Sequence, residues 1–425
     1  MRFVRELTSW LSGASDPDRF PYPAVLAEFH RVGKHFVEKE LLALLDQVRA
    51  EVAARPTPAP LLSAFLDVTL DKWDARYDYR SYLALRLLRL PGAEDGLAHR
   101  SDDADPAEGR RDRDRLLVDL VADALAFELD AAADATDLLP EQRPGPAVVD
   151  KRCRLGVRAV AAALARLGLA GAVTDPDPAT AAAELHTLAS ATRDTAGQRV
   201  LRLSMLPVYV SHDEYLFIRV LQAYECVFAG VADELHATVT ALSTGHPPAA
   251  ADRLAYACDL LTTAGPLFSL LATMQPASFR TFREYTEGAS AIQSRSYKLM
   301  ESLCRVPEPA RLDSAAYRSV PEVRDRVRAG QPVIDQAYRA AVRAGRLGGP
   351  DRDLVRRRMA TFAEAVLQWR RTHHRLATRM LGSRPGTGYT EGTPYLAAVR
   401  SIPVFTTVPH GARPAPNDPT GGCPE

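Results

Sequence analysis

One histidine in this 425-residue chain stands where it could bind a metal-containing cofactor. His373 falls within an apolar stripe whose members recur at spacings of four and three residues, as on the buried face of a helix. The stripe comprises Phe362, Val366, Trp369, His373, Leu376 and Met380. The adjacent His374 lies about 100° away around the helix. A buried imidazole in an apolar wall is what an axial heme ligand requires, although an ordinary core role stays open.

A second segment combines an aromatic ring with a cation. Phe279 and Arg283 are four residues apart on one face of a helix that Pro276 can begin and Gly288 can end. A guanidinium is a planar fork of donors and can hold a carboxylate through two parallel hydrogen bonds. The segment predicts a carboxylate-binding arginine, with a solvated or salt-bridged arginine as the alternative.

Two further segments could complete a binding pocket. Phe217, Leu221, Tyr224 and Phe228 recur at four, three and four residues, which predicts either a flat aromatic wall or part of an ordinary core. After the His373 helix, Gly386-Thr387-Gly388 can bring backbone N–H groups and the Thr387 hydroxyl close to a polar group.

The elements that must position these residues are predicted to be helices throughout. Apolar residues recur at three and four spacings, and alternating runs rich in β-branched residues are nearly missing, so we expect an all-α protein. The predicted helices cover about 22–54, 60–88, 113–136, 150–168, 178–192, 212–243, 249–274, 276–286, 290–304, 319–345 and 351–382. Residues 92–112 are predicted to be a loop, and 401–425 a disordered tail rich in proline and glycine.

Composition narrows the classes of partner. The 53 basic and 53 acidic residues balance, which argues against nucleic acid and anionic lipid as partners. The five cysteines are scattered without a CxxC pair, so neither a disulfide framework nor a zinc site is expected. We find no signal peptide and no run of about 18 apolar residues that would cross a membrane, so a cytoplasmic location is expected.

Taken in their order along the chain, the segments 211–225, 275–294 and 369–392 resemble the tryptophan 2,3-dioxygenase superfamily of histidine-ligated heme-dependent aromatic oxygenases. The resemblance rests on the helix start at 212–218, on Phe282-Arg283 with Ser290 and Gln293-Ser294, and on Trp369-Arg370 to His373 with the Gly-Thr-Gly at 386–388. A weaker similarity covers 79–88. The resemblance as a whole implies a tryptophan 2,3-dioxygenase-like helical bundle at 61–400, with an insertion at about 91–205. A helical extension at 1–60 would precede this bundle.

The resemblance also implies roles for single residues. His373 would be the proximal ligand of the heme iron, Phe217 a wall of the substrate pocket and Arg283 the clamp on the substrate carboxylate. Thr387 would contact the substrate ammonium, and Ser290 would belong to the same pocket. The cofactor would be heme b held non-covalently, because the position at which some relatives carry a heme-linked cysteine is Ala377. Dioxygen and an aromatic amino acid would be the small-molecule partners, and no side chain acts as catalyst beyond the iron.

Departures from the family pattern bear on the reaction. Leu221 occupies the position at which many members of the family carry a distal histidine, so no general base is expected there. Phe279 occupies a position at which the family commonly has a tyrosine. A phenol gains from such a base, whereas an indole is already electron-rich, so an indole substrate is favoured. After Gly388 the substrate loop is bulkier and carries Glu391.

The leading hypothesis is insertion of oxygen from O2 into the indole ring of tryptophan or a tryptophan derivative. Ring opening, as in a 2,3-dioxygenase, is the favoured outcome of this insertion. Two alternatives stay open: a heme-dependent monooxygenase of tyrosine or another aromatic amino acid in secondary metabolism, and a non-catalytic heme-binding helical protein. The resemblance further implies a homo-oligomer, a dimer or a tetramer.

Overall fold

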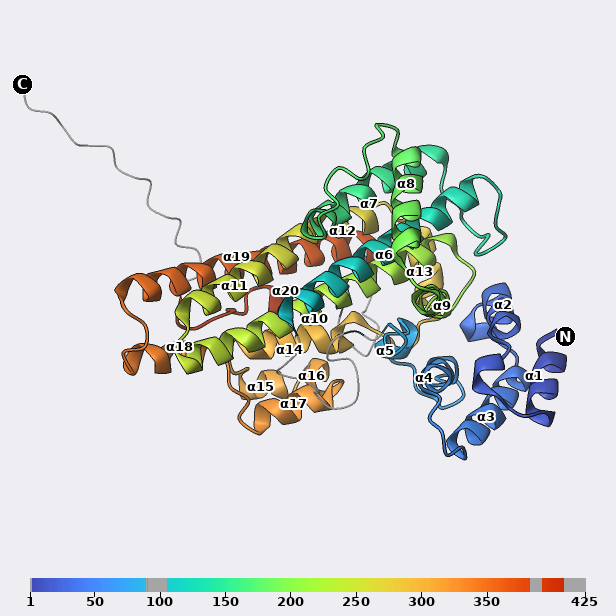
Figure 1. Cartoon of the computed structure of the whole chain (residues 1–425), viewed down its shortest axis with the longest axis horizontal. Helices are drawn as coiled ribbons and strands as arrows, with labels where there is room; N and C mark the ends of the chain where they lie inside the picture. Colours follow the sequence, from blue (N-terminus) through green and yellow to red (C-terminus); the bar gives the residue numbers. More distant parts are fainter. Residues whose placement is uncertain (1, 89, 91–104, 383–391, 409–425) are drawn as a thin grey trace, which may run out of the picture.

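The computed structural model describes residues 2–88, 90, 105–382 and 392–408, and Figure 1 shows them as an assembly of helices. Within these ranges the chain forms no β-strand, and extended pairing is limited to an isolated bridge between Glu141 and Ser211. The predicted all-α class is therefore confirmed.

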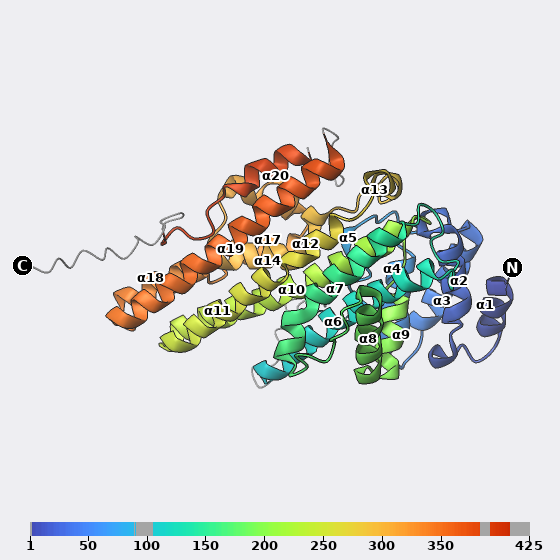
Figure 2. The same cartoon turned by 90° about the horizontal axis from the view of Figure 1, so that it is seen from above.

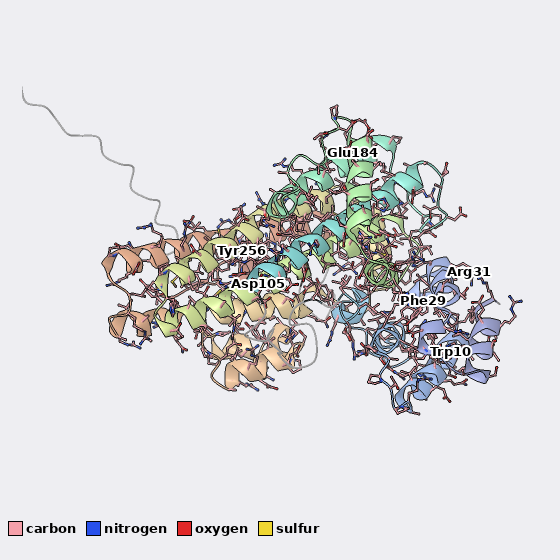
Figure 3. The ribbon with its side chains drawn as sticks, viewed as in Figure 1. Trp10, Phe29, Arg31, Asp105, Glu184 and Tyr256 are labelled. Atoms are coloured by element: carbon pink, nitrogen blue, oxygen red, sulfur yellow. The ribbon has the colours of Figure 1, made fainter. Side chains whose placement is uncertain are left out.

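The N-terminal helices have a hydrophobic core of their own. They are α1 (Arg2–Ser12), η1 (Pro17–Arg19), α2 (Tyr22–Val32), η2 (Lys34–Phe36), α3 (Lys39–Ala53) and α4 (Pro60–Thr69). Their core includes Trp10 and Phe29, labelled in Figure 3, and it extends to Leu203 and Leu206 from a later part of the chain. These helices therefore pack against the rest of the protein through apolar contacts.

The next helices precede the long central helix α10 (His212–Thr244) in the chain, and one of them packs along it. They are α5 (Tyr79–Tyr82), α6 (Pro106–Ala132), α7 (Pro146–Arg166), α8 (Pro178–Thr192) and α9 (Thr195–Leu203). Helix α6 packs against α7, α8 and α10, so the predicted insertion covers one flank of the bundle (Figure 1). Asp105 caps α6 through a hydrogen bond from Ala107 N, so the last residues of the predicted 92–112 loop are instead helical.

The remaining helices build the bundle that holds the predicted site. They are α10 (His212–Thr244), α11 (Pro247–Thr263), α12 (Gly265–Leu271), α13 (Pro276–Arg283), η3 (Ala291–Gln293), α14 (Arg295–Cys304), α15 (Pro309–Leu312), α16 (Ala315–Arg318), α17 (Pro321–Arg328), α18 (Ile334–Arg343), α19 (Gly349–Leu381) and α20 (Thr393–Arg400). Helix α10 packs against α11, α14 and α18, and α11 packs against α19. Figure 2 shows these long helices running side by side.

Two predicted helices are broken at glycines. The helix predicted over 22–54 stops at Gly33, where φ is +82° and an added Cβ would lie 2.5 Å from the carbonyl oxygen of Val208. The helix predicted over 319–345 is divided at Gly330, where φ is +85°. Only glycine adopts such φ values without strain, so both breaks have a local backbone cause.

Of the two most apolar long segments, only α10 lies mostly in the interior of the bundle. Helix α10 and the segment Pro247–Leu271 are long and apolar enough to cross a membrane, but the most apolar window of α10 is 89% buried by other protein segments, and that of Pro247–Leu271 is 50% buried. Helix α10 is accordingly the central core helix of the bundle. The chain after α20 also packs inward, because Val404, Phe405 and Val408 are buried. The described part of the predicted tail, residues 401–408, is therefore packed, and the rest of that prediction lies outside the described residues.

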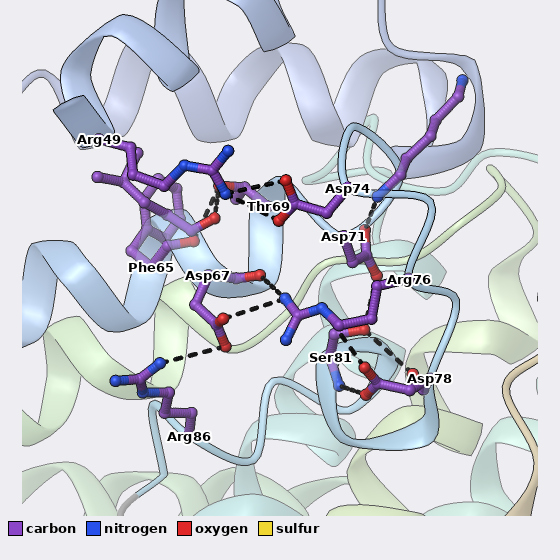
Figure 4. A network of polar contacts seen from close by, with 12 residues as sticks. Arg49, Phe65, Asp67, Thr69, Asp71, Asp74, Arg76, Asp78, Ser81 and Arg86 are labelled. Atoms are coloured by element: carbon purple, nitrogen blue, oxygen red, sulfur yellow. Dashed lines mark hydrogen bonds and ion pairs between the residues drawn. The ribbon is translucent and has the colours of Figure 1, made fainter.

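A polar network ties the N-terminal helices to α5, as Figure 4 shows. The buried Lys34 Nζ lies 2.6 Å from Asp71 Oδ2, which also accepts a hydrogen bond from Ser81 Oγ at 2.7 Å. Asp78 caps α5 through the N–H of Ser81 at 2.8 Å. The network therefore fixes the short helix that carries Tyr79 and Tyr82.

Candidate functional site

The predicted site residues meet around one cavity of about 240 Å³ between α5, α10, α12, α13, α14, α19 and α20. Its lining includes Phe217, Leu221, Phe279, Arg283, Ser290 and His373. These residues come from segments far apart in the sequence, and the fold brings them together. Thr387 lies outside the described residues.

Aromatic rings form one wall of the cavity. The ring centroid of Phe217 lies 5.6 Å from that of Phe279, at an interplanar angle of 64°, and 5.3 Å from that of Phe282. Leu221, one turn further along α10, is buried. The position predicted to lack a distal base is therefore an aliphatic surface beside aromatic rings, an arrangement suited to an apolar ring system.

His373 lies on the inward face of α19, as its stripe predicts. Phe362, Val366 and Met380 of that stripe are buried, and the imidazole lies near the rings of Trp369 (centroids 5.0 Å apart) and Phe268 (6.3 Å apart). Burial, helped by the neighbouring His374, lowers the pKa of His373 to about 4. The imidazole is therefore neutral at pH 7, the form that binds a metal.

The environment of His373 fits an axial heme ligand. No residue in the described ranges hydrogen-bonds to its ring, and the ring borders the cavity. Ala377, one turn later, also lines the cavity and offers no thiol. A neutral imidazole that accepts no hydrogen bond from a described residue, set in an apolar wall, has the donor chemistry that heme iron needs. His374 is not among the described lining residues.

Helix α13 is held against the start of α10, and this contact positions Phe279 and Arg283. Gln275 N, at the N-terminus of α13, donates to Asp213 Oδ2 at 2.7 Å. Ser211 Oγ and Ser278 Oγ are 2.6 Å apart. Two residues at the start of α10 thus bind the first turn of α13, and Arg283 at its last turn reaches the cavity.

Helix α5 contributes two tyrosines that sequence reasoning did not place in the site. Tyr79 and Tyr82 line the cavity, and the Tyr82 hydroxyl donates to Glu214 Oε1 at 3.2 Å. Burial raises the pKa of Glu214 to about 8. The weaker similarity of 79–88 to the family was the available signal for this wall.

A charged cluster at one end of the cavity was also missed. Lys298, Arg311 and Arg370 all line the cavity and surround the carboxylate of Glu301. Arg370 belongs to the Trp-Arg-x-x-His motif, but it is not a member of the apolar stripe that contains His373. The structure instead buries Arg370, with 5% of its surface exposed.

Part of the chain that lines the cavity is similar to known proteins, whereas His373 lies outside the range matched by the family model. A model of the tryptophan 2,3-dioxygenase family matches residues 202–342, which contain the cavity residues of α10, α13 and α14. The tryptophan 2,3-dioxygenase of a Nocardioides species is 31% identical over 216 residues, covering 44% of this chain and 79% of the relative. That of Anaeromyxobacter dehalogenans is 28% identical over 270 residues, covering 55% of this chain and 96% of the relative.

Proposed function

Because the chain belongs to the tryptophan 2,3-dioxygenase superfamily, we propose that it is a heme-dependent oxidoreductase that inserts oxygen from O2 into the indole ring of tryptophan or a tryptophan derivative. Of the possible outcomes, we favour opening of the indole ring between C2 and C3. The cofactor is heme b bound non-covalently, and the small-molecule partners are O2 and the amino acid. We place the reaction in the cytoplasm.

One observation carries the proposal: His373 and Arg283 line the same cavity, with aromatic and aliphatic side chains forming its walls. A ligand that spans them would place an aromatic ring near the imidazole and a carboxylate near the guanidinium. This is the layout that an aromatic amino acid needs.

His373 would hold the heme iron, and the heme would supply the oxygen-activating chemistry of the reaction. Arg283 binds the substrate carboxylate through its fork of donors, while Phe217 and Phe279 hold the ring by edge and face contacts. This orientation restricts which ring carbons can react. The apolar walls exclude water from the reacting groups.

The wall at Leu221 favours indole over phenol. Leu221 offers no proton acceptor, and the Tyr82 hydroxyl is directed to Glu214 rather than left as a free donor. A phenol would therefore find no base there, whereas an indole requires none. Ser290 and Thr387 remain proposed contacts to the amino-acid part of the substrate, the latter on the strength of the resemblance alone.

The experiment is a product-mass measurement. Purified full-length protein loaded with heme is supplied with tryptophan, O2 and a reductant, in parallel with tyrosine and a small panel of substituted tryptophans. A gain of two oxygen atoms on an indole substrate is expected. A gain of one oxygen on tyrosine would favour the monooxygenase alternative, and no product with any member of the panel would favour a non-catalytic heme protein.

A further inference from the structure

Three cations converge on a single carboxylate where α14, α15 and α19 meet the cavity. Arg311 Nη2 lies 2.9 Å from each carboxylate oxygen of Glu301, Lys298 Nζ lies 3.2 Å from Oε2, and Arg370 Nη2 lies 3.4 Å from Oε1. We call Lys298, Glu301, Arg311 and Arg370 the Glu301 cluster. Each of its three cations also lines the cavity, whereas Glu301 does not.

The Glu301 cluster is buried and carries an excess of two positive charges. The side chains of Lys298, Arg370 and Arg311 are 3%, 4% and 11% exposed. Within the described ranges Glu301 is the sole carboxylate paired with any of them. Burial would raise the pKa of Glu301, yet the three cations hold that pKa far below its ordinary value.

The other contacts of the cluster are neutral and do not balance this charge. Arg370 Nε donates to the Tyr297 hydroxyl at 2.9 Å, Arg370 Nη1 donates to the carbonyl oxygen of Ile402 at 2.7 Å, and Arg311 Nη1 donates to the Tyr395 hydroxyl at 3.1 Å. Buried charge without a counter-charge is costly, so cations that border a cavity favour an anionic occupant. Two positive charges in excess match an occupant with two anionic groups.

An apolar, aromatic surface connects the cluster to His373. Arg370 is three residues before His373 on α19, and the ring of Trp369 lies 5.0 Å from that of His373 and 5.3 Å from that of Tyr297. The occupant that fits is accordingly large, flat and apolar, with two carboxylates at one edge. The substrate carboxylate does not meet this description, because it is single and its proposed clamp, Arg283, lies on α13.

We propose that the Glu301 cluster is a dicarboxylate-binding site that receives the two propionate groups of the heme and thereby sets the rotation of the macrocycle above His373. The assignment rests on the proposed function, since it requires a heme in this cavity. Lys298 and Arg311 act as charge partners of the propionates. Glu301 keeps the three cations together when the propionates are absent.

The test compares two probes that differ in charge alone. Apo full-length protein is titrated with hemin and with hemin dimethyl ester, and binding is followed by the Soret band. The ester keeps the macrocycle and lacks the two negative charges. Wild-type protein should bind hemin about ten-fold or more tightly than the ester, the change expected when a buried charge loses its partner.

Variants assign this difference to the cluster. Lys298→Met and Arg311→Gln should each weaken hemin binding about ten-fold while changing ester binding little. Arg324→Gln, which removes an arginine from the exposed pair with Asp313, is the matched control and should bind both probes like the wild type. Circular dichroism on each variant confirms that it folds; because the two cluster variants alter different residues, either one that folds decides the outcome.

The outcomes separate this inference from the proposed function. If neither probe gives a Soret band typical of histidine ligation, the proposed function fails, and this assignment with it. If both probes bind the wild type equally, heme binding stands and the propionate assignment is wrong. If both probes bind equally and succinate also raises the melting temperature of the apo wild type but not of Lys298→Met, the cluster binds a free dianion and not the heme propionates.

Discussion

Arg152 Nη2 lies 2.5 Å from Asp213 Oδ1, and both side chains are completely buried. The same guanidinium lies 2.7 Å from Glu128 Oε1. The second oxygen of Asp213 accepts a hydrogen bond from Gln275 N at the start of α13. Glu128 belongs to α6 and Arg152 to α7, both within the predicted insertion. These two helices are therefore part of the support for the helices that carry Phe217 and Arg283.

Replacing Arg152 with methionine should destabilise the whole domain. The substitution keeps much of the side-chain volume but leaves Glu128 and Asp213 buried without their cation. We expect a loss of about 3–5 kcal/mol in the free energy of unfolding, measured by urea denaturation. Arg324→Met, at the exposed pair with Asp313, should cost less than about 1 kcal/mol. Equal, small losses for both variants would show that the buried pair does not support the fold.

His373→Ala should abolish the Soret band of the heme-loaded protein, because it removes the proposed iron ligand. His374→Ala is the matched control: it changes the neighbouring histidine, which is not among the described lining residues, and should retain heme. Added imidazole should restore part of the band in His373→Ala by occupying the vacated space. The ligand assignment is wrong if His374→Ala loses heme and His373→Ala keeps it.

Arg283→Ala should reduce kcat/KM for an amino-acid substrate by about 10- to 100-fold, mainly through a higher KM, because a charge-assisted bidentate contact is lost. Heme content should not change, since Arg283 lies on α13 and His373 on α19. Arg280→Ala removes an arginine from the same helix that is not among the described lining residues, and should leave both constants near wild-type values. An Arg283→Ala enzyme with unaltered kinetics would exclude the clamp.

Periodicity was sufficient to predict the parts of the site that lie along single helices. A repeat of four and three residues identifies the inward face of any long helix, and it located Phe217 on α10 and His373 on α19. The order of the motifs predicted that these faces share a pocket, and the cavity contains both. Their roles toward heme and substrate stay predictions.

The remaining features depend on contacts between distant segments, which periodicity does not report. The Glu301 cluster needs α14, α15 and α19 to meet, and each of its charged residues by itself is typical of a solvated helix face. The break at Gly33 depends on the close approach of the chain at Val208. Helix propensity alone predicts a continuous helix there, because one glycine costs only about 1 kcal/mol.

Glu225 gives the stability of the protein a pH dependence that a single substitution should remove. Its carboxyl lies inside α10 with 1% of its surface exposed, close to the hydroxyl groups of nearby residues. Burial raises the pKa of Glu225 from 4.5 to about 7, although Ser294, Ser296 and Tyr79 lower it in part. The folded protein therefore keeps a proton there over a range of pH in which the unfolded chain has released it.

Between about pH 4.5 and 7 the unfolded state binds fewer protons at this position, so the contribution of Glu225 to stability is lost as the pH rises. Glu225→Gln mimics the protonated form at every pH. The wild type should lose on the order of 2 kcal/mol more than Glu225→Gln when urea denaturation at pH 5 is compared with pH 7.5. Glu364→Gln, at an exposed position on α19, should follow the wild type. If Glu225→Gln loses as much stability as the wild type over this range, the buried carboxyl is not the group that titrates.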